Sequence, residues 1–362
     1  MKTSENCGSV LVGMSGGVDS SVAALQLKNK GFSITGVTLK LWCDENSSTE
    51  RNDGYFKDAE DAKSVCERLK AEHTVFDFTD IFKECVIDKF VNEYKNGNTP
   101  NPCIECNKLV KFGAMLSKAE SLGYDFIATG HYARISQNNG RFLLSRPKDV
   151  LKDQTYVLYV LSQNQLSKTL FPLGDLTKAQ VREIARENGF VNSDRKDSQD
   201  ICFVPDGKYY EFINRYTGKK ATPGKYIDLN GKIIGENLGF ECYTVGQRKG
   251  LGMGFGKPMY VISKNSKENT VTLGEETELF SKTVLVKDVN FIVSDKLNAP
   301  LKCKGKLRYR QKEEDCILHQ LDETTLLAEF DKPQRAITPG QAAVFYDGEY
   351  VVAGGTICGE KM

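Results

Sequence analysis

The chain has 362 residues, long enough for two or three domains that each bury a core of their own. Lys and Arg number 49 against 48 Asp and Glu, so net charge indicates no partner and any RNA-binding surface has to be local. Eleven cysteines are many, but their odd number and scattered positions do not fit a disulfide scaffold. Neither a signal peptide, an Arg-rich presequence nor an apolar run of roughly 20 residues is found, so we expect a cytoplasmic protein.

Strands and helices are expected to alternate in the first part of the chain. Apolar runs predict strands at 10–12, 32–41, 73–77 and 126–129, and helical spacing predicts helices at 19–30, 55–71, 80–94 and 108–122. Further helices are expected near 162–169 and 178–188, and Asn139-Gly140 is typical of a tight hairpin turn. The alternation predicts an α/β fold with a doubly wound parallel sheet, whose ligands bind at the carboxyl ends of the strands.

Beyond about residue 205 the pattern changes to short strands, glycine turns and prolines. Asn230-Gly231 predicts a second hairpin, and residues 244–257 form a Gly-rich basic loop. From about Val284 onward, strands at short spacing predict a small β-barrel or sandwich. We therefore expect an α/β nucleotide-binding domain at 1–205, a small β-rich domain at 206–280 and a C-terminal β-barrel at 281–362.

The turn between the first strand and the first helix predicts an anion site. Gly16 and Gly17 allow a close backbone approach, the amides of Ser15 to Ser20 can point into one concavity, and the helix N-terminus adds partial positive charge. The turn lacks the Lys of G-x-x-x-x-G-K-[ST], which argues against a kinase or GTPase. The string Ser-Gly-Gly-Val-Asp-Ser-Ser resembles the pyrophosphate loop of ATP pyrophosphatases, which split ATP into AMP and pyrophosphate to activate an oxygen.

Three cysteines stand apart from the others, which are mostly in apolar settings typical of core residues. Cys103 and Cys106 lie in a Pro-flanked loop before the helix expected from Lys108, and Cys202 lies in a second polar loop. A helix N-terminus and neighbouring lysines favour the thiolate, which attacks sulfur or binds metal. Cys-x-x-Cys is also half of a zinc site, but no second pair with zinc spacing completes four ligands.

A run of cations near the C-terminus suggests an RNA-binding strand. The run has a cation at every second residue, at Lys302, Lys304, Lys306, Arg308, Arg310 and Lys312. In a strand this period places all six on one face, which suits a phosphate track and predicts strongly salt-dependent binding. The alternative is an edge strand whose lysines block aggregation.

A set of motifs in one order along nearly the whole chain identifies a family. They are Asn101-Pro102-Cys103-Ile104-Glu105-Cys106-Asn107-Lys108, Ala128-Thr129-Gly130-His131-Tyr132, Lys152-Asp153-Gln154, Asp197-Ser198 with Ile201-Cys202-Phe203, Val245-Gly246-Gln247-Arg248-Lys249-Gly250-Leu251-Gly252, Arg308-Tyr309-Arg310-Gln311 and Thr338-Pro339-Gly340-Gln341. Together they resemble the tRNA-specific 2-thiouridylase family. This resemblance implies an ATP-pyrophosphatase domain of the adenine nucleotide alpha hydrolase type with tRNA-contacting insertions, followed by the two β-rich domains.

The resemblance also implies a reaction. The enzyme would adenylate O2 of the wobble uridine, U34, in the tRNAs for Lys, Glu and Gln, and replace that oxygen with sulfur, releasing AMP and pyrophosphate. A relay protein or cysteine desulfurase would load sulfur onto Cys202 as a persulfide. Cys106 would be the partner thiol, either releasing sulfide or resolving the persulfide, and would leave a Cys106–Cys202 disulfide.

Binding roles follow from the same resemblance. ATP, with Mg²⁺ on its phosphates, would contact Gly13, Met14, Ser15, Gly16, Gly17, Val18, Asp19, Ser20, Leu39 and Gly130. The target base would meet Asn101, Pro102 and Cys103. The tRNA would touch His131, Lys152, Asp153, Gln154, Arg308, Tyr309 and Gln341.

One position departs from the family pattern. Many relatives carry Asp, proposed as an acid/base group, where this chain has Cys103, so that role is unassigned here. Thiolates at Cys103, Cys106 and Cys202 would leave one iron of a [4Fe–4S] cluster open to sulfide, so a cluster route stands beside the persulfide route. Two rivals remain: another ATP pyrophosphatase acting on a small molecule, and a tRNA-binding protein that has lost catalysis.

Overall fold

The computed structural model describes residues 7–42, 50–193, 195, 201–204 and 207–359, with the backbone alone described at 50–55. The chain forms two compact units. Unit 1 comprises Met1–Val86, Cys103–Gln199 and Glu349–Val351, and unit 2 comprises Ile87–Pro102, Asp200–Gly348 and Val352–Met362. The motif Asp197-Ser198 and Cys43 lie outside the described residues.

Unit 1 is built on a five-stranded sheet in the order β3-β2-β1-β4-β7. Its strands are β1 (Ser9–Gly13), β2 (Ser33–Lys40), β3 (Glu72–Asp77), β4 (Phe126–Ala128) and β7 (Thr169–Leu170). All four neighbouring pairs are parallel. The predicted parallel α/β sheet is confirmed.

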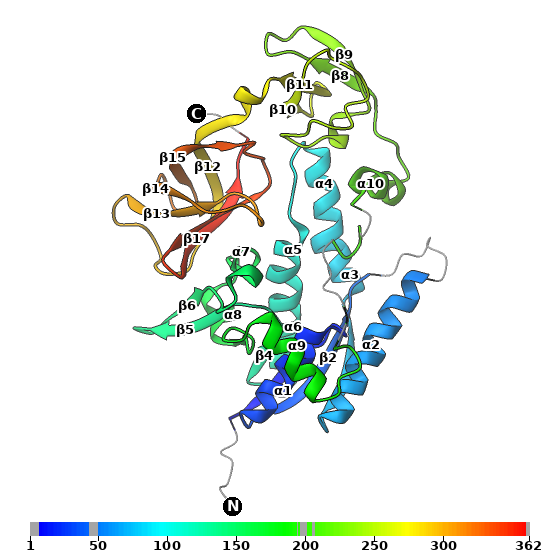
Figure 1. The fold of residues 1–362 in the computed structure, drawn as a ribbon, viewed down its shortest axis with the longest axis vertical. Helices are drawn as coiled ribbons and strands as arrows, with labels where there is room; N and C mark the ends of the chain where they lie inside the picture. The colour runs from blue at the N-terminus through cyan, green and yellow to red at the C-terminus, as the bar shows by residue number, and fades with distance from the viewer. Residues whose placement is uncertain (1–6, 43–49, 194, 196–200, 205–206, 360–362) are drawn as a thin grey trace, which may run out of the picture. The chain divides into compact units, whose positions relative to one another are not determined.

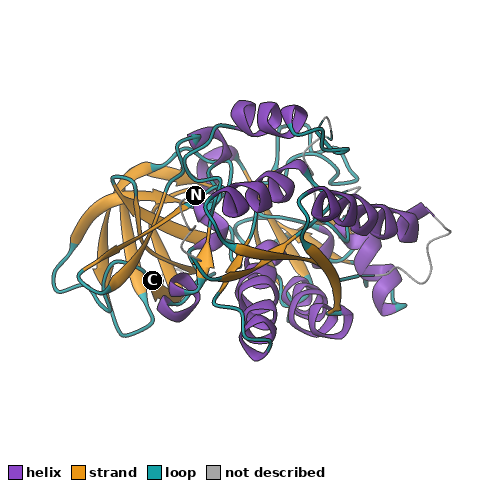
Figure 2. Cartoon of the chain, turned by 90° about the horizontal axis from the view of Figure 1, so that it is seen from below, coloured by secondary structure: helices purple, strands orange, loops and turns teal. Residues whose placement is uncertain are grey.

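Helices lie on both faces of this sheet (Figures 1 and 2). The helical segments wholly or mostly in unit 1 are α1 (Val18–Asn29), α2 (Glu50–Arg68), α3 (Thr79–Phe82), π-helical η1 (Lys83–Asp88), α5 (Pro102–Glu105), π-helical η2 (Cys106–Ala114), α6 (Met115–Ser121), 3₁₀-helical η3 (Val150–Lys152), α7 (Thr155–Leu158), α8 (Gln163–Ser167) and α9 (Lys178–Glu187). Val10 and Val12 share a core with side chains of α1, α2 and α9. Gly13 faces Met115 of α6 instead. Since successive strand residues point to opposite faces, α6 covers the other side and the sheet is doubly wound.

Among the described residues, two helical segments contain π-helical turns. α3 continues through η1 (Lys83–Asp88) into α4 (Lys89–Lys95), and α5 continues through η2 into α6. The second segment begins at Pro102 and not at Lys108, because proline lacks the N–H that a first helical residue leaves unpaired and its φ is already helical. Cys103 and Cys106 therefore lie inside the helical segment, and the prediction that they lie in the preceding loop was wrong.

The Asn139-Gly140 hairpin is confirmed. It joins β5 (Arg134–Asn138) to β6 (Arg141–Ser145), and both turn residues have positive φ, 48° and 80°. A two-residue turn of this kind matches the right-handed twist of the strands, and Asn-Gly adopts it at low cost.

The middle part of unit 2 is a four-stranded sheet in the order β10-β11-β8-β9. Its elements are β8 (Gly224–Ile227), β9 (Ile233–Asn237), β10 (Tyr260–Asn265) and β11 (Thr270–Gly274), with α10 (Tyr209–Thr217) and the 3₁₀ turns η4 (Phe240–Cys242) and η5 (Glu276–Leu279). A small core around Tyr226, Tyr243 and Leu251 fills its interior. The predicted Asn230-Gly231 turn connects β8 to β9, with Gly231 at φ 82°.

The C-terminal part of unit 2 is a closed barrel, drawn from yellow to red in Figure 1. Its strands are β12 (Phe280–Phe291), β13 (Leu301–Lys306), β14 (Glu314–Gln320), β15 (Leu326–Arg335), β16 (Ala342–Asp347) and β17 (Tyr350–Ile357). The order β12-β15-β14-β13-β16-β17 closes through an antiparallel pairing of β12 with β17. The predicted barrel is confirmed.

The prediction that a single strand carries all six cations is wrong, because the strand is shorter than expected. β13 ends at Lys306, so only Lys302, Lys304 and Lys306 alternate with inward-facing residues of one strand. Leu307 is buried, and the Arg308 guanidinium turns back to donate to Ala336 O at 2.6 Å. The remaining cations belong to the turn before β14, so no continuous track of six exists.

Within the described residues, no helix is both long and apolar enough to cross a membrane.

Candidate functional site

The turn after β1 presents an open helix N-terminus at the carboxyl edge of the sheet. Gly17 is the N-cap of α1, and no side chain caps the helix there. Ser20 Oγ instead donates to Gly17 O at 3.0 Å and accepts from Ser15 N at 3.2 Å, which fixes the turn. First-turn amides without a side-chain cap, reinforced by the helix dipole, form the kind of site that binds a phosphate.

Gly16 packs against helix α2 so closely that no other residue fits. Its φ is 68°, and a Cβ built there would lie 2.6 Å from Asp58 O. The Gly16 carbonyl accepts from Asn192 Nδ2 at 2.8 Å and from Arg195 Nη1 at 3.3 Å. Arg195 also pairs with Asp58 at 2.6 Å; burial raises the pKa of Asp58 and the guanidinium opposes that rise. These contacts satisfy the Gly16 carbonyl within the protein.

The carboxylate of Asp19, in the first turn of α1, has its negative charge balanced by an ion pair within unit 1. Lys178 Nζ lies 2.8 Å from both of its carboxylate oxygens, and Tyr132 OH donates to Oδ1 at 2.8 Å. The Lys178 side chain is only 10% exposed. Because its charge is compensated, Asp19 does not repel an anion bound beside it.

Gly130 closes the other side of the same turn. It follows β4, and a Cβ there would lie 2.7 Å from Ser20 N. Leu39 lies near the carboxyl end of β2, the strand next to β1 in the sheet. The structure therefore places both residues, which the sequence assigned to ATP, at the carboxyl ends of strands flanking β1.

Sequence reasoning missed Lys178, Asn192, Arg195 and Tyr132 as supports of this turn. Lys178 is 159 residues from Asp19 and Asn192 is 176 residues from Gly16. The one available signal was the position of Tyr132 directly after the Thr129-Gly130-His131 strand end.

Cys103 and Cys106 occupy the first turns of the segment formed by α5 and η2. Cys106 is 7% exposed, whereas Cys103 reaches solvent. Burial raises the pKa of the Cys106 thiol, and the surrounding protein raises that of Cys103 even though its side chain keeps accessible surface. The prediction that the helix start and nearby lysines favour thiolates is therefore wrong for both residues at rest, because loss of water has the larger effect.

The positive charge of Lys111 opposes the rise in pKa at both the Cys103 and the Cys106 thiols. It is half-buried and has no ion-pair or hydrogen-bond partner within the described part of the chain. In an α-helix a side chain five residues on would point roughly 140° away. The wider i→i+5 winding of η2, which starts at Cys106, brings Lys111 back toward the face of that thiol.

Replacing Lys111 with Met is expected to raise the pKa of Cys106 further, because the buried thiolate loses its nearest cation. Less thiolate then exists at any given pH, so the pH profile of Cys106 alkylation by iodoacetamide moves to higher pH. Peptide mass spectrometry across pH 7 to 10 measures the profile. Lys111→Arg and the exposed Lys108→Met serve as controls, and equal profiles in Lys111→Met and Lys108→Met would contradict this role.

His131 is held neutral close to the same segment. Thr129 Oγ1 lies 2.7 Å from His131 Nδ1. The centroid of the His131 ring lies 5.7 Å from that of Phe112 and 6.2 Å from that of Phe171. Burial, reinforced by Lys111, holds the pKa of His131 well below its usual value. The imidazole is therefore an uncharged hydrogen-bonding group near neutral pH.

Cys202 lies at the surface of unit 2, next to Phe203, which is buried. Ile201 and Val204 form a bridge across a turn, and Phe203 packs on Phe90 and Phe212 with ring centroids 5.3 Å and 5.1 Å apart. Phe203 is 3% exposed, while Cys202 is exposed. The hydrophobic packing of Phe203 fixes the turn, and the Cys202 side chain remains exposed.

The other cysteines divide by burial. Cys66, Cys303 and Cys316 are buried, as expected of core residues, and Cys7 is exposed, contrary to that expectation. Cys303 and Cys316 face each other across β13 and β14 with their sulfur atoms 3.6 Å apart.

The residues assigned to tRNA lie in both units. Asp153 and Gln154 are engaged in unit 1: Asp153 Oδ1 accepts from Thr155 N at 2.9 Å, and Gln154 Oε1 accepts from Tyr132 N at 2.8 Å. Lys152 ends η3 beside the 93% exposed Leu151. The structure thus gives Asp153 and Gln154 a structural role in addition to the predicted one.

In unit 2, Gln341 connects the barrel to the segment before Asn101. Gln341 Nε2 donates to Thr99 O at 2.7 Å, and Thr99 N donates to Pro339 O at 2.8 Å. Tyr309 is 40% exposed, with the Lys306 ammonium 6.0 Å from its ring centroid. The barrel turn 338–341 therefore fixes the segment that leads to Asn101 and Pro102.

Metal-ion binding requires a group of ligating side chains, and Asp19 is one candidate ligand. Across the described ranges, no three His, Cys, Asp or Glu side chains are grouped to hold a metal ion. Asp19 is not a free ligand either, because both of its oxygens accept from Lys178.

Comparisons with known proteins agree along the chain. Family models match as a tRNA methyl transferase HUP domain at residues 8–206, a tRNA methyl transferase PRC-barrel domain at 210–275 and an aminomethyltransferase beta-barrel domain at 281–357. The tRNA-specific 2-thiouridylase MnmA of Clostridium acetobutylicum is 49% identical over 350 residues, covering 96% of this chain and 99% of that protein. The proteins of the same name from Acetivibrio thermocellus and Clostridioides difficile are 48% and 47% identical, covering 96% of this chain and 98% and 97% of theirs. Among solved structures, a 4-thiouridine synthetase–RNA complex with bound ATP aligns with a TM-score of 0.33 and 20% identity, over 55% of this chain and 45% of that one.

Proposed function

This chain belongs to the tRNA-specific 2-thiouridylase family, and we propose that it thiolates the wobble uridine of tRNA at the expense of ATP. One structural observation carries the proposal. Unit 1 combines an uncapped helix N-terminus, with its Asp19 neutralised, and a helical segment that carries two thiols and an unpaired lysine. A small-molecule ATP pyrophosphatase would need only the first of these features.

ATP binding falls to the turn after β1. The amides of Ser15 to Ser20 and the start of α1 would hold the β- and γ-phosphates, and Gly130 keeps the far side of the turn free of a side chain. Mg²⁺ would be carried by those phosphates and would neutralise part of their charge. Attack of uridine O2 on the α-phosphorus then forms the O2–P bond and breaks the bond to pyrophosphate.

Sulfur transfer falls to Cys202 and Cys106. A donor protein would leave a persulfide on the exposed Cys202. Its terminal sulfur attacks C2 of the adenylated base, and AMP leaves with the C2–O electron pair. The Cys106 thiolate then attacks Cys202 Sγ, so that the new sulfur stays on C2 and a Cys106–Cys202 disulfide forms. A thiol reductant must reduce that disulfide before the next turnover.

Several finer assignments accompany this proposal. The tRNAs for Lys, Glu and Gln would be the substrates, with U34 meeting Asn101, Pro102 and Cys103. His131, Lys152, Arg308 and Tyr309 would contact the tRNA. The division into domains at 1–205, 206–280 and 281–362 is supported by the order of the family-model matches. The free cysteines suit a reducing cytoplasm.

The [4Fe–4S] route is the second candidate. It would require Cys103 and Cys106 of unit 1 and Cys202 of unit 2 as ligands of one cluster. We derive no step through iron. Iron analysis after anaerobic purification, together with Cys103→Ala, separates the routes: iron at about four per chain and an inactive variant would favour the cluster.

Nucleoside mass spectrometry tests the function directly. The chain is incubated with an unmodified tRNA transcript whose anticodon begins with U, ATP, Mg²⁺, cysteine and a cysteine desulfurase. We expect 2-thiouridine at the wobble position, with one AMP and one pyrophosphate per sulfur inserted. AMP formation at full rate without tRNA would instead indicate an ATP pyrophosphatase acting on a small molecule.

A further inference from the structure

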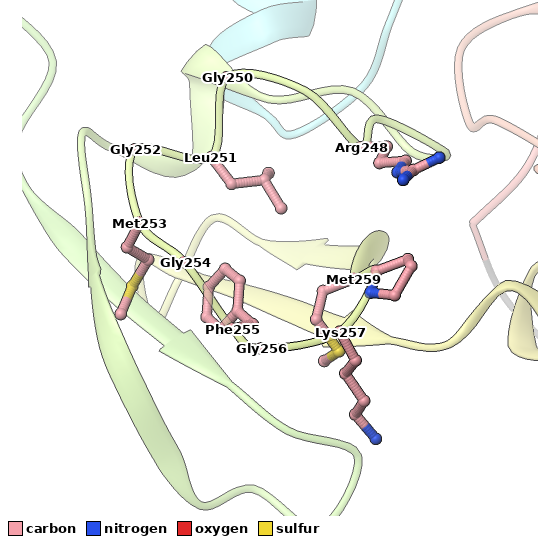
Figure 3. A pocket seen from close by; sticks show the side chains of 11 residues that line it. Arg248, Gly250, Leu251, Gly252, Met253, Gly254, Phe255, Gly256, Lys257 and Met259 are labelled. Carbon is pink, nitrogen blue, oxygen red and sulfur yellow. The ribbon is translucent and has the colours of Figure 1, made fainter.

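The loop between η4 and β10 borders an open surface pocket that none of the roles above uses. Arg248 and the residues from Gly250 to Met259 line it from a single stretch of chain, and its volume is about 470 Å³ (Figure 3). That size lies in the range of small-ligand sites. The pocket lies wholly within unit 2, in the segment matched by the PRC-barrel model.

Glycines give the loop its concave shape. Gly250, Gly252 and Gly256 have φ of 75°, 76° and 70°, in the left-handed region that side chains disfavour. A Cβ on Gly252, Gly254 or Gly256 would meet nothing within 4 Å. The space beside these residues is open, so the loop exposes backbone that an incoming group can approach closely.

The loop is anchored on one side and apolar on the other. Tyr226 OH donates to Leu251 O at 2.9 Å, and the Phe255 ring lies 5.9 Å from the Tyr226 ring at 83°. Met253 is 43% exposed although its thioether packs over Gly235. Met253, Phe255 and Met259 therefore give the pocket apolar, polarisable side chains, of the kind against which an aromatic ring packs.

The loop that forms the pocket carries positive charge. The stretch Arg248 to Met259 contains Arg248, Lys249 and Lys257 and no acidic residue. Lys257 is paired with Glu275 at 2.5 Å. The exposed side chains of Arg248 and Lys249 have no ion-pair partner in the described ranges. Apolar side chains, unpaired cations and exposed loop amides together match the chemistry of a base joined to a phosphate.

We propose that this loop binds one unstacked nucleotide of the tRNA, away from the reacting uridine. The base stacks against Met253 and Phe255, and the phosphate binds Arg248 and the glycine amides. An acidic protein partner would match the charge, but a one-nucleotide pocket adds little to the roughly 800 Å² per partner of a stable protein interface. The inference rests on the proposed tRNA thiolation and adds a second RNA contact to it.

Filter binding of an unmodified tRNA transcript to the full chain, between 50 and 300 mM salt, tests the inference. Arg248→Gln is expected to weaken binding about fivefold or more and to lower the salt slope by about one. Met253→Ser, an exposed position, is expected to weaken binding about threefold to tenfold, with the salt slope unchanged because no charge is removed. Lys232→Gln removes an exposed cation from the β8–β9 turn of the same domain and is the matched control.

Further measurements keep this result separate from the proposed function. Thermal unfolding and ATP affinity are expected to equal those of the wild type in each variant, since the loop lies outside unit 1. If the wild type thiolates tRNA while Arg248→Gln and Met253→Ser bind tRNA as tightly as Lys232→Gln, the inference fails and the function stands. Weakened binding of the sulfur donor with unchanged tRNA binding would also overturn the inference, by assigning the loop to a protein.

Discussion

Replacing Cys106 or Cys202 with Ser is expected to reduce 2-thiouridine formation at least roughly a thousandfold, because each thiol forms or breaks a sulfur bond that a hydroxyl cannot. ATP binding is expected to persist, since the turn after β1 uses neither side chain. The two variants differ in where the reaction stops. Cys202→Ser carries no persulfide, whereas Cys106→Ser accepts sulfur on Cys202 and stalls after it. Persulfide labelling and nucleoside mass spectrometry on the same samples measure both steps.

Cys7→Ser is the matched control, because Cys7 is another exposed cysteine without an assigned role. It should retain wild-type activity. Full activity in Cys106→Ser would show that sulfur leaves Cys202 without this partner thiol. Cys103→Ala decides whether the third thiol, which stands where many relatives have Asp, takes part at all.

Replacing Lys178 with Met is expected to weaken ATP binding roughly tenfold to a hundredfold. The change leaves the Asp19 carboxylate uncompensated beside the phosphate site, and removing one partner of a largely buried pair costs far more than the pair contributes. Asp19 is still 31% exposed, so solvent reduces the effect below that of a fully buried charge. Isothermal titration with a non-hydrolysable ATP analogue measures the change.

The double variant Lys178→Met/Asp19→Asn tests the cause of that loss. It removes the unpaired charge as well as the lysine and is expected to recover most of the affinity. Lys118→Met removes an exposed lysine of α6 and serves as the control. An unchanged affinity in Lys178→Met, or a double variant no better than the single one, would show that charge compensation at Asp19 is not what prepares the site.

Local sequence was sufficient for the elements that carry their own signals. The apolar run at Val10 to Val12 and the glycines after it predict both β1 and the turn that starts α1. Asn139-Gly140 predicts its hairpin, because a turn with two positive φ values admits few other residues. The alternation of strands and helices predicts the order of unit 1.

Tertiary contacts explain what the sequence could not predict. Lys178 and Asn192 support the β1–α1 turn from far along the chain, and no local pattern marks them. Burial at Cys106 reverses the expected effect of a helix start and a nearby lysine on the thiol pKa. The period of two near Lys306 continues in the sequence after β13 has ended, because Leu307 enters the core and Arg308 bonds to Ala336.

A single turnover without reductant tests the central claim most directly. Persulfide-loaded protein is mixed with ATP and unmodified tRNA, quenched in acid and alkylated, and the peptides that contain Cys106 and Cys202 are mapped by mass spectrometry. The account predicts one Cys106–Cys202 disulfide for each 2-thiouridine formed. Accumulation of 2-thiouridine while both cysteines remain alkylatable thiols would contradict it.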